Sequence, residues 1–314
     1  MIERYVVVVG SMNCDVIYMQ ERLPQKGETF FAKSASIVAG GKGANQAVQA
    51  AKLGIKTYMV AKMGADIFGE LLRSELRGYG VDDTYVLTGK GMTGIAAVLT
   101  MPDGVYYSTV APGTNMELTL DEVKVLRELI CNASVVILQN EITQAVTEQV
   151  IRMAHEAGVY IVYNAAPAKA VSNECLAMVD CLVVNEIEAS YYLGKTIDSV
   201  KAAKENYLRL LSKTGGTLVI TLGSKGSLLC KAENCTYYPA NETIKAVETT
   251  GSGDSYVGAY AFMKANGNSD EEACRLASLV SQNTVTKVGG QPSMPYWAEI
   301  EEQWEQKKRT PSPD

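Results

Sequence analysis

The chain of 314 residues is poor in histidine, a residue on which many catalytic and metal sites depend. Its one histidine, His155, falls within an amphipathic helical pattern, far from any motif. A serine hydrolase at Gly253-Asp254-Ser255 would need a histidine base near the serine, and most zinc sites also use histidine. We therefore expect neither kind of site, and we expect His155 to lie on a helix surface.

Paired cysteines and long apolar runs are missing as well. The seven cysteines contain no CxxC spacing, their number is odd, and most lie in apolar segments. This pattern predicts reduced, buried thiols rather than disulfides or a zinc site. No apolar run is long enough to span a bilayer, and "YVVVVG" (5–10) is typical of a strand rather than of a signal peptide. We therefore expect a cytoplasmic protein with no membrane partner.

The chain also lacks an excess of positive charge. Its formal net charge is −6, and its isoelectric point is about 5.1. Lysine and arginine are scattered, so no basic surface suited to a nucleic acid is expected.

What is present is an alternation of two patterns, which predicts an α/β fold. Helical periodicity separates apolar runs typical of buried strands. The sequence therefore predicts a doubly wound, mostly parallel central sheet flanked by helices, with its ligands at the carboxyl ends of the strands. Polar residues do follow the runs there: Asn140, Glu141, Asn164, Asn185 and Glu188. The predicted strands are 5–10, 57–64, 134–140, 159–164, 181–186 and 217–223, and the clearest helices are 43–54, 69–80, 143–158 and 199–216.

Two segments interrupt the alternation. Residues 14–38 have no helical period, and residues 94–110 are typical of a hairpin that turns at 102–104. We expect these segments, at about 14–38 and 92–112, to form a small antiparallel β-sheet lid inserted in a single domain, residues 1–305. Lid strands with apolar faces tend to pair across a dimer, so a homodimer is expected. Residues 306–314 are predicted to be a disordered tail.

Two motifs near the N-terminus suit a polyhydroxylated ligand. In "GSMNCD" (10–15), Asn13 and Asp15 can point the same way from an extended segment, although an Asx turn is an equally simple interpretation. In "VAGGKGANQAVQAAKLG" (38–54), glycines before a helix allow close approach of a ligand. Lys42 is followed by Gly43 rather than by serine or threonine, so this is not a Walker P-loop.

Two later motifs suit phosphate chemistry. In "NEIEAS" (185–190), Asn185 and Glu188 share a face of a first helical turn, where they could orient hydrated Mg²⁺ or could simply cap the helix. In "ETTGSGDSYVGAY" (248–260), a glycine-rich loop leads into a helix. Its N–H groups could hold a phosphate while Asp254 accepts a proton, although N-capping by Ser252 or Asp254 is the plainer alternative.

Taken together, these motifs resemble the ribokinase-like family of sugar and nucleoside kinases, in order from residue 6 to about residue 295. Any one of the matching segments is weak evidence, and six in register are strong. They are "GSMNCD" (10–15), "GGKGANQA" (40–47), "VNEIEA" (184–189), "TLGSKG" (221–226), "TTGSGDSYVGA" (249–259) and "VGGQPS" (288–293).

The resemblance implies transfer of the γ-phosphoryl group of ATP to the 5-hydroxyl of D-ribose, with Mg²⁺ and an activating monovalent cation, typically K⁺. It implies Asp254 as the base and Gly251, Ser252 and Gly253 as the anion hole. The implied sugar ligands are Asn13, Asp15, Gly41, Lys42, Asn45, Glu141 and Asp254. The implied ATP contacts are Asn185, Thr221, Gly223, Gly226 and Asn283, and Asn185 and Glu188 are the implied Mg²⁺ organisers, through water. The implied monovalent-cation residues are Glu248, Thr250, Thr284, Lys287, Gly289 and Ser293, mostly through backbone oxygens.

The chain departs from the family pattern at three positions. Glu248 stands where an aspartate is usual, Ala165 replaces a usual proline, and Ala39 replaces a bulkier residue near the sugar. The first change bears on the cation site and the third on strict ribose specificity. A nucleoside kinase of the same fold and a non-catalytic sugar sensor are therefore kept as alternatives.

Overall fold

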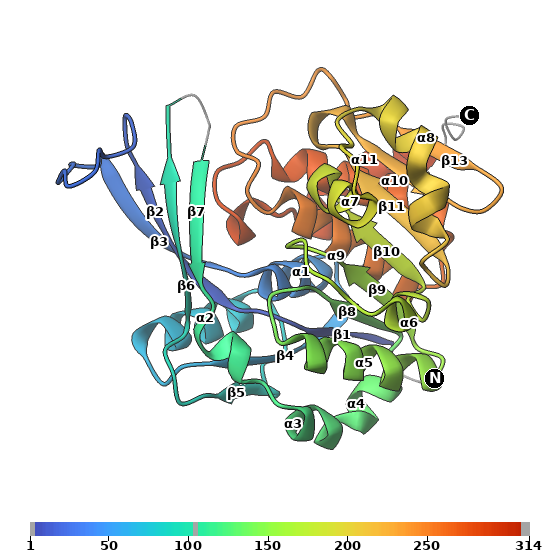
Figure 1. The fold of residues 1–314 in the computed structure, drawn as a ribbon, viewed down its shortest axis with the longest axis horizontal. Helices are drawn as coiled ribbons and strands as arrows, with labels where there is room; N and C mark the ends of the chain where they lie inside the picture. The colour runs from blue at the N-terminus through green and yellow to red at the C-terminus, as the bar shows by residue number, and fades with distance from the viewer. Residues whose placement is uncertain (1–3, 103–105, 309–314) are drawn as a thin grey trace.

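The computed structural model describes residues 4–102 and 106–308, and a nine-stranded sheet forms its centre (Figure 1). The strand order is β13-β12-β11-β10-β9-β8-β1-β4-β5. The strands from β11 to β5 are parallel to their neighbours, while β12 and β13 form an antiparallel edge. The bounds are β1 Tyr5–Val9, β4 Lys56–Met63, β5 Val86–Thr88, β8 Val135–Leu138, β9 Tyr160–Asn164, β10 Cys181–Val184, β11 Thr217–Thr221, β12 Ser227–Cys230 and β13 Cys235–Tyr238.

Helices cover both faces of this sheet, because both faces of its central strands are apolar. In β1, Val6 and Val8 pack towards α1, α9 and α10, whereas Val7 and Val9 pack towards α5 and α8. The doubly wound, mostly parallel architecture expected from the sequence is thereby confirmed. The helices are α1 Lys42–Lys52, α2 Ile67–Gly78, α3 Leu120–Val125, α4 Arg127–Cys131, α5 Gln144–Glu156, α6 Asn173–Leu176, α7 Glu186–Leu193, α8 Val200–Leu211, α9 Ser252–Ala265, α10 Asp270–Thr284 and α11 Trp297–Lys308, with short 3₁₀ turns η1 Gly113–Glu117, η2 Gly223–Lys225 and η3 Gln291–Ser293.

A second, four-stranded sheet projects from one side of the body as a lid (Figure 1). Its order is β3-β2-β6-β7, with bounds β2 Asn13–Met19, β3 Ser34–Gly40, β6 Gly94–Thr100 and β7 Tyr106–Ala111. The expected lid is confirmed, but its antiparallel character holds only in part, because β2 and β6 are parallel. A parallel pair needs a long connection between its two strands, and here β3, α1, β4, α2 and β5 lie between β2 and β6 in the chain. The turn of the β6–β7 hairpin was predicted at 102–104, and residues 103 and 104 of it lie outside the described residues.

The C-terminal tail begins later than the sequence predicts. Residues 306–308 continue α11 instead of being disordered. The side chain of Lys308 pairs with Glu305 at 2.9 Å and lies 5.4 Å from the centre of the Trp304 ring. Cations in a last turn also interact favourably with the helix dipole. The rest of the predicted tail, residues 309–314, lies outside the described residues.

Two smaller predictions concern single residue types. Five of the seven cysteines are buried, as expected, whereas Cys131 and Cys235 are half-buried. His155 is exposed on α5. Within residues 4–102 and 106–308, no helix combines the length and the apolar character needed to cross a bilayer.

Candidate active site

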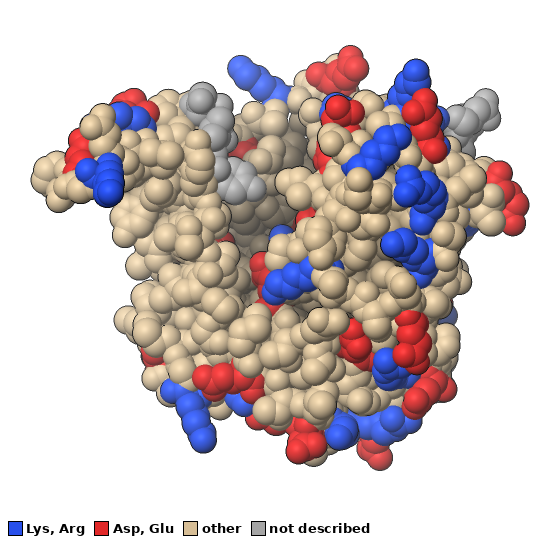
Figure 2. Space-filling view, in the orientation of Figure 1, with Lys and Arg blue, Asp and Glu red and all other residues tan. Residues whose placement is uncertain are grey.

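The polar residues singled out above gather at the carboxyl ends of the central strands, where the helices α1 and α9 begin. Figure 2 shows a hollow there, between the lid and the body, with acidic and basic side chains at its margin. Asp254 lies in the first turn of α9. Carboxyl ends of parallel strands are the usual ligand site of this architecture.

Asp254 is 8% exposed and is held by two amide side chains of α1. Asn45 Nδ2 donates to its Oδ2, and Gln46 Nε2 donates to its Oδ1, both at 2.9 Å. Burial raises the pKa of Asp254, while Lys42 and the two amide donors oppose that shift. The result is a fixed carboxylate with an increased affinity for a proton.

Gln46 belongs to a buried row of amides that the sequence analysis did not identify. Its Oε1 accepts from Gln139 Nε2 at 2.7 Å, and its Nε2 also donates to Asn164 Oδ1 at 3.0 Å. Gln139 follows β8 and Asn164 ends β9, so the row connects two strand ends to α1 and α9. The only signal in the sequence was the position of Asn164 at a strand end.

The glycines before α1 allow close packing of two chain segments. A Cβ atom at Gly41, where φ is +88°, would lie 2.6 Å from Asn13 N, and one at Gly40 would clash with the carboxylate of Asp15. The segment 40–43 therefore lies directly against 11–15. This contact brings the residues of "GSMNCD" and "GGKGANQA" into one site.

Asn13, Asp15, Lys42 and Glu141 meet in that site. Ser11 Oγ donates to Glu141 Oε2 at 2.5 Å, and Lys42 N donates to the same oxygen at 3.2 Å. Burial, and then the charges of Glu141 and Asp254, raise the pKa of Asp15 to about 7, while Lys42 opposes the shift. Three carboxylates around one lysine are suited to accepting hydrogen bonds from several hydroxyl groups.

Asn115 of η1 orients Asn13 and was missed by the sequence analysis. It is 1% exposed, and its Nδ2 donates to Asn13 Oδ1 at 2.8 Å. Its Oδ1 accepts from Met12 N at 2.9 Å. The amide of Asn13 is therefore fixed with its oxygen engaged. A lone asparagine after the lid hairpin carries no sequence signal for this task.

The loop before Asp254 leaves the N-terminus of α9 open. Gly251 is the N-cap residue, with φ +77°, and has no side chain with which to cap the first turn. Ser252 N donates to Thr249 O at 3.2 Å. The alternative interpretation of N-capping by Ser252 or Asp254 is therefore wrong, and the next N–H groups of the turn are suited to an anion.

Asn185 and Glu188 form a capping box at the start of α7. Asn185 Oδ1 accepts from the backbone N–H groups of Ile187 and Glu188, and Glu188 Oε2 accepts from Asn185 N at 2.8 Å. Burial raises the pKa of Glu188, while the bond from Asn185 and the charge of Lys42 lower it. The capping interpretation is therefore correct. The Glu188 carboxylate also lies close enough to Lys42 for the lysine charge to act on its pKa.

The residues expected to contact ATP are only partly brought together. Thr221 ends β11, and Gly223 and Gly226 lie in the turn that follows, which is closed by the bond from Leu222 N to Gly226 O at 2.8 Å. Asn283 is engaged elsewhere. Its Nδ2 donates to Leu279 O within α10 and to Gln303 Oε1 of α11.

The expected monovalent-cation residues come from two loops that lie side by side. Gly289 N donates to Glu248 Oε2 at 2.9 Å, and Val247 N donates to Val285 O at 2.7 Å. Thr250 lies against Gly290. Ser293 Oγ donates to Gly290 O at 2.8 Å, and Thr284 is buried, whereas the side chain of Lys287 pairs with Glu299. A carboxylate next to loop carbonyls fits a hard cation.

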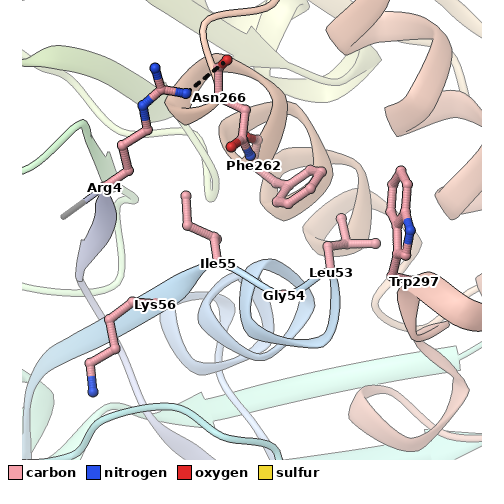
Figure 3. A pocket seen from close by; sticks show the side chains of 8 residues that line it. All are labelled: Arg4, Leu53, Gly54, Ile55, Lys56, Phe262, Asn266 and Trp297. Carbon is pink, nitrogen blue, oxygen red and sulfur yellow. Dashed lines mark hydrogen bonds between the residues drawn. The ribbon is translucent and has the colours of Figure 1, made fainter. Parts of the chain in front are cut away.

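A solvent-open pocket of about 540 Å³ lies away from these residues (Figure 3). Arg4 precedes β1, and Ile55 and Lys56 lead into β4, so the pocket adjoins the amino ends of the strands. Phe262 and Trp297 form part of its wall. It is therefore separate from the cluster around Asp254. Among the described residues, no group of three or more histidine, cysteine, aspartate or glutamate side chains could hold a metal ion.

Known proteins have similar sequences and structures over nearly the whole chain. The family model "pfkB family carbohydrate kinase" matches residues 3–297. A ribokinase of Mus musculus is 35% identical over 296 residues, which are 93% of this chain and 92% of that protein. A ribokinase of Staphylococcus aureus is 32% identical over 299 residues, 94% of this chain and 98% of that protein. The structure of Arabidopsis thaliana ribokinase in complex with ribose and ATP is 32% identical, with a TM-score of 0.88 over 96% of this chain and 99% of that chain.

Proposed function

Since the chain belongs to the pfkB family of carbohydrate kinases, we propose that it is a ribokinase, which transfers the γ-phosphoryl group of ATP to the 5-hydroxyl of D-ribose. The observation that carries this proposal is the fixed carboxylate of Asp254. It lies between an open helix N-terminus and a cluster of polar residues suited to a sugar. A base beside an anion site is the arrangement that phosphoryl transfer to a hydroxyl needs.

The sugar would lie over "GSMNCD" and "GGKGANQA". Its hydroxyls would donate to Asp15 and Glu141 and meet the amides of Asn13 and Asn45, with the backbone of Gly41 close by. These contacts would point the 5-hydroxyl at Asp254, which takes its proton as the oxygen attacks phosphorus. Positioning of this kind can account for much of the rate enhancement of a phosphoryl transfer.

The transferred group would lie at the N-terminus of α9. There the N–H groups of Gly251 and Gly253 would meet its oxygens, and that of Ser252 would join them by exchanging its bond to Thr249 O, with Lys42 opposite. Thr221, Gly223 and Gly226 would contact the nucleotide. Asn185 and Glu188 fit the water shell of Mg²⁺, which keeps several waters and supplies charge neutralisation to the phosphates when bound.

The two loops at 248–250 and 284–293 would hold a monovalent cation. Their backbone carbonyl oxygens and the Glu248 carboxylate fit K⁺, which such oxygens coordinate in place of water. Gly290 of the second loop, 284–293, lies against Gly251. A bound cation that orders this loop would therefore also order the anion hole.

The lid would pair with the lid of a second copy to form a homodimer. Its exposed apolar side chains are Tyr18, Met19, Ile37, Tyr107 and Val110. Such a concentration on one sheet is typical of an interface. Light scattering on the eluting protein would detect the dimer, and Ile37→Lys should increase the monomer fraction. We also place the enzyme in the cytoplasm, where ATP is available and thiols stay reduced.

The test is a coupled assay of ATP turnover with Mg²⁺, with and without K⁺, against D-ribose, 2-deoxyribose, fructose, adenosine, inosine, uridine and pseudouridine. Turnover of D-ribose well above every other acceptor is expected. Preference for a nucleoside would show that D-ribose is not the acceptor, while the proposed phosphoryl transfer from ATP would still hold. Absence of turnover with every acceptor, in protein that still binds ribose by calorimetry, would instead support a sugar sensor.

A further inference from the structure

One face of α1 is polar although it is buried. Asn45, Gln49 and Lys52 are spaced by four and three residues, so they share that face. Their exposed fractions are only 6%, 0% and 4%. All three bond to the same short segment, residues 291–295, which overlaps the end of the proposed cation loop at 284–293. Most of the polar atoms on this face are hydrogen-bonded, whereas Gln49 Oε1, and Gln291 Oε1 on the facing segment, are buried without a hydrogen-bond partner.

Lys52 forms the firmest of these links. Its Nζ donates to Gln291 O at 2.8 Å and to Met294 O at 2.9 Å. The ammonium also lies 4.4 Å from the ring centre of Tyr79 and 4.7 Å from that of Tyr296. Two carbonyl acceptors and two aromatic faces offset only part of the cost of burying the charge, since burial still lowers the pKa of Lys52 to about 8. Lys52 therefore fixes the backbone of 291–294 on the end of α1.

Gln291 extends this link to the carboxylate of Asp254. Its Nε2 donates to Asn45 Oδ1 at 3.1 Å, and Asn45 Nδ2 donates to Asp254 Oδ2 at 2.9 Å. A donor on the oxygen side of the Asn45 amide forces its nitrogen side towards Asp254. All three side chains are at least nine-tenths buried, so water cannot readily replace either bond.

We infer that Lys52 and Gln291 are positioning residues for the catalytic base. Lys52 holds the backbone of the 291–294 segment, and the Gln291 side chain fixes the Asn45 amide so that it donates to Asp254. The inference rests on the proposed role of Asp254 as the base. It adds that the orientation of that base depends on a segment about 40 residues further along the chain, and on an ammonium group that touches neither sugar nor nucleotide.

Gln291→Glu tests the direction of the hydrogen bonds. An ionised carboxylate cannot donate to Asn45 Oδ1. In the variant, Asn45 Oδ1 either stays against the introduced carboxylate, which repels it, or the amide flips and places Oδ1 against Asp254 in place of the Nδ2 donor. With D-ribose and ATP at pH 7, where the Lys52 ammonium is still mostly charged, kcat is expected to fall by about tenfold or more, with little change in the KM for ATP. As the pH falls, protonation of the introduced carboxyl restores a donor, so the ratio of variant to wild-type kcat should rise.

Lys52→Met and Lys52→Arg test the ammonium. The methionine variant should lose kcat several-fold, whereas arginine, which keeps the charge and several donors, should recover most of it. Lys264→Met is the matched control, because Lys264 is a poorly exposed lysine that donates to Asn268 O and pairs with Asp270 at the far end of α9. It should lower the thermal midpoint without lowering kcat.

Two results would overturn the inference. One is a Gln291→Glu enzyme whose kcat and pH profile match those of the wild type. The other is a Lys52→Met enzyme that loses stability as the Lys264→Met control does and keeps its kcat. Failure of the proposed function would look different, because the wild-type protein itself would then show no turnover of a pentose.

Discussion

Asp254 and Asp270 are both poorly exposed aspartates in the first turn of a helix, and their helices, α9 and α10, pack against each other. Their partners differ. Asp254 accepts hydrogen bonds from the neutral amides of Asn45 and Gln46, whereas Asp270 forms ion pairs with Lys264 at 2.8 Å and with Lys231 at 3.1 Å.

The pKa values of the two carboxyl groups shift in opposite directions. Burial raises the pKa of Asp254 more than its amide donors and Lys42 lower it. Burial also acts on Asp270, but hydrogen bonds from Lys264 and Tyr260 and the lysine charge outweigh it and hold that pKa well below its ordinary range. Neutralisation by lysines makes a carboxylate a stabilising group, while amide donors leave it able to take a proton.

The largest effect expected from this comparison is on catalysis, in Asp254→Asn. The variant keeps its fold and its binding of D-ribose but loses the proton acceptor, so kcat should fall by about a thousandfold or more. The measurement is the coupled assay, with ribose binding followed by calorimetry. Near-normal turnover would remove Asp254 from the role of base.

Asp270→Asn should have the opposite outcome. Removing one partner of a poorly exposed ion pair leaves Lys264 and Lys231 without a counter-charge, so the free energy of unfolding should fall by about 3 kcal/mol. A depressed carboxyl pKa contributes stability above the unfolded pKa and loses it in acid, so the deficit should shrink below about pH 4. Urea denaturation at pH 7 and pH 3.5 measures this, and kcat at 25 °C should be unchanged. A large loss of kcat in folded protein would contradict the division between the two sites.

The variant Asp15→Asn tests whether a carboxylate of the site lowers the free energy of unfolding. The pKa of Asp15 is raised to about 7, so the stability it contributes is present below its ordinary pKa and is lost as the pH rises through 7. Relative to the wild type, Asp15→Asn should therefore gain stability between pH 5 and pH 8, by about 1 kcal/mol after solvent screening. Thermal unfolding without ligand at the two pH values measures the difference. A gain that is equal at both values would argue against the raised pKa.

The smallest effect is expected at Glu248, which is one methylene longer than the aspartate usual in the family. Its Oε2 already accepts from Gly289 N, so K⁺ activation is expected but should be weak. Glu248→Asp should increase the ratio of rates with and without K⁺ by about twofold, because a shorter carboxylate leaves more room among the carbonyl oxygens. Identical rates of the wild type with and without K⁺ would show that these loops hold no activating cation.

Periodicity predicted the main sheet because its strands are buried on both faces and its helices are amphipathic. β12 and β13 were not predicted, because no α-helix separates them from β11 and the alternation of helix and strand therefore did not mark them. The parallel pairing of β2 with β6 depends on the path of the whole chain between them, which no local pattern contains.

The motifs located most of the candidate site, since glycines and polar strand ends mark it in the sequence. They did not identify Gln46, Gln139 or Asn115, because a buried amide in a helix or loop looks like any surface amide until its partners are known. Asn283 is the opposite case. The resemblance implied an ATP contact for it, but its side chain bonds to Leu279 O and to Gln303 Oε1 instead.

The lid begins at the proposed sugar site, because Asn13 pairs in register with both Gly40 and Gly94 at the base of β2. For the design of chimaeras, the lid is therefore not an independent module. A graft that exchanges it with a related enzyme, cut at its natural borders, also exchanges Asn13, Asp15 and the residues next to Gly41. Acceptor preference should travel with such a graft, and the phosphate-handling half of the chain should remain behind.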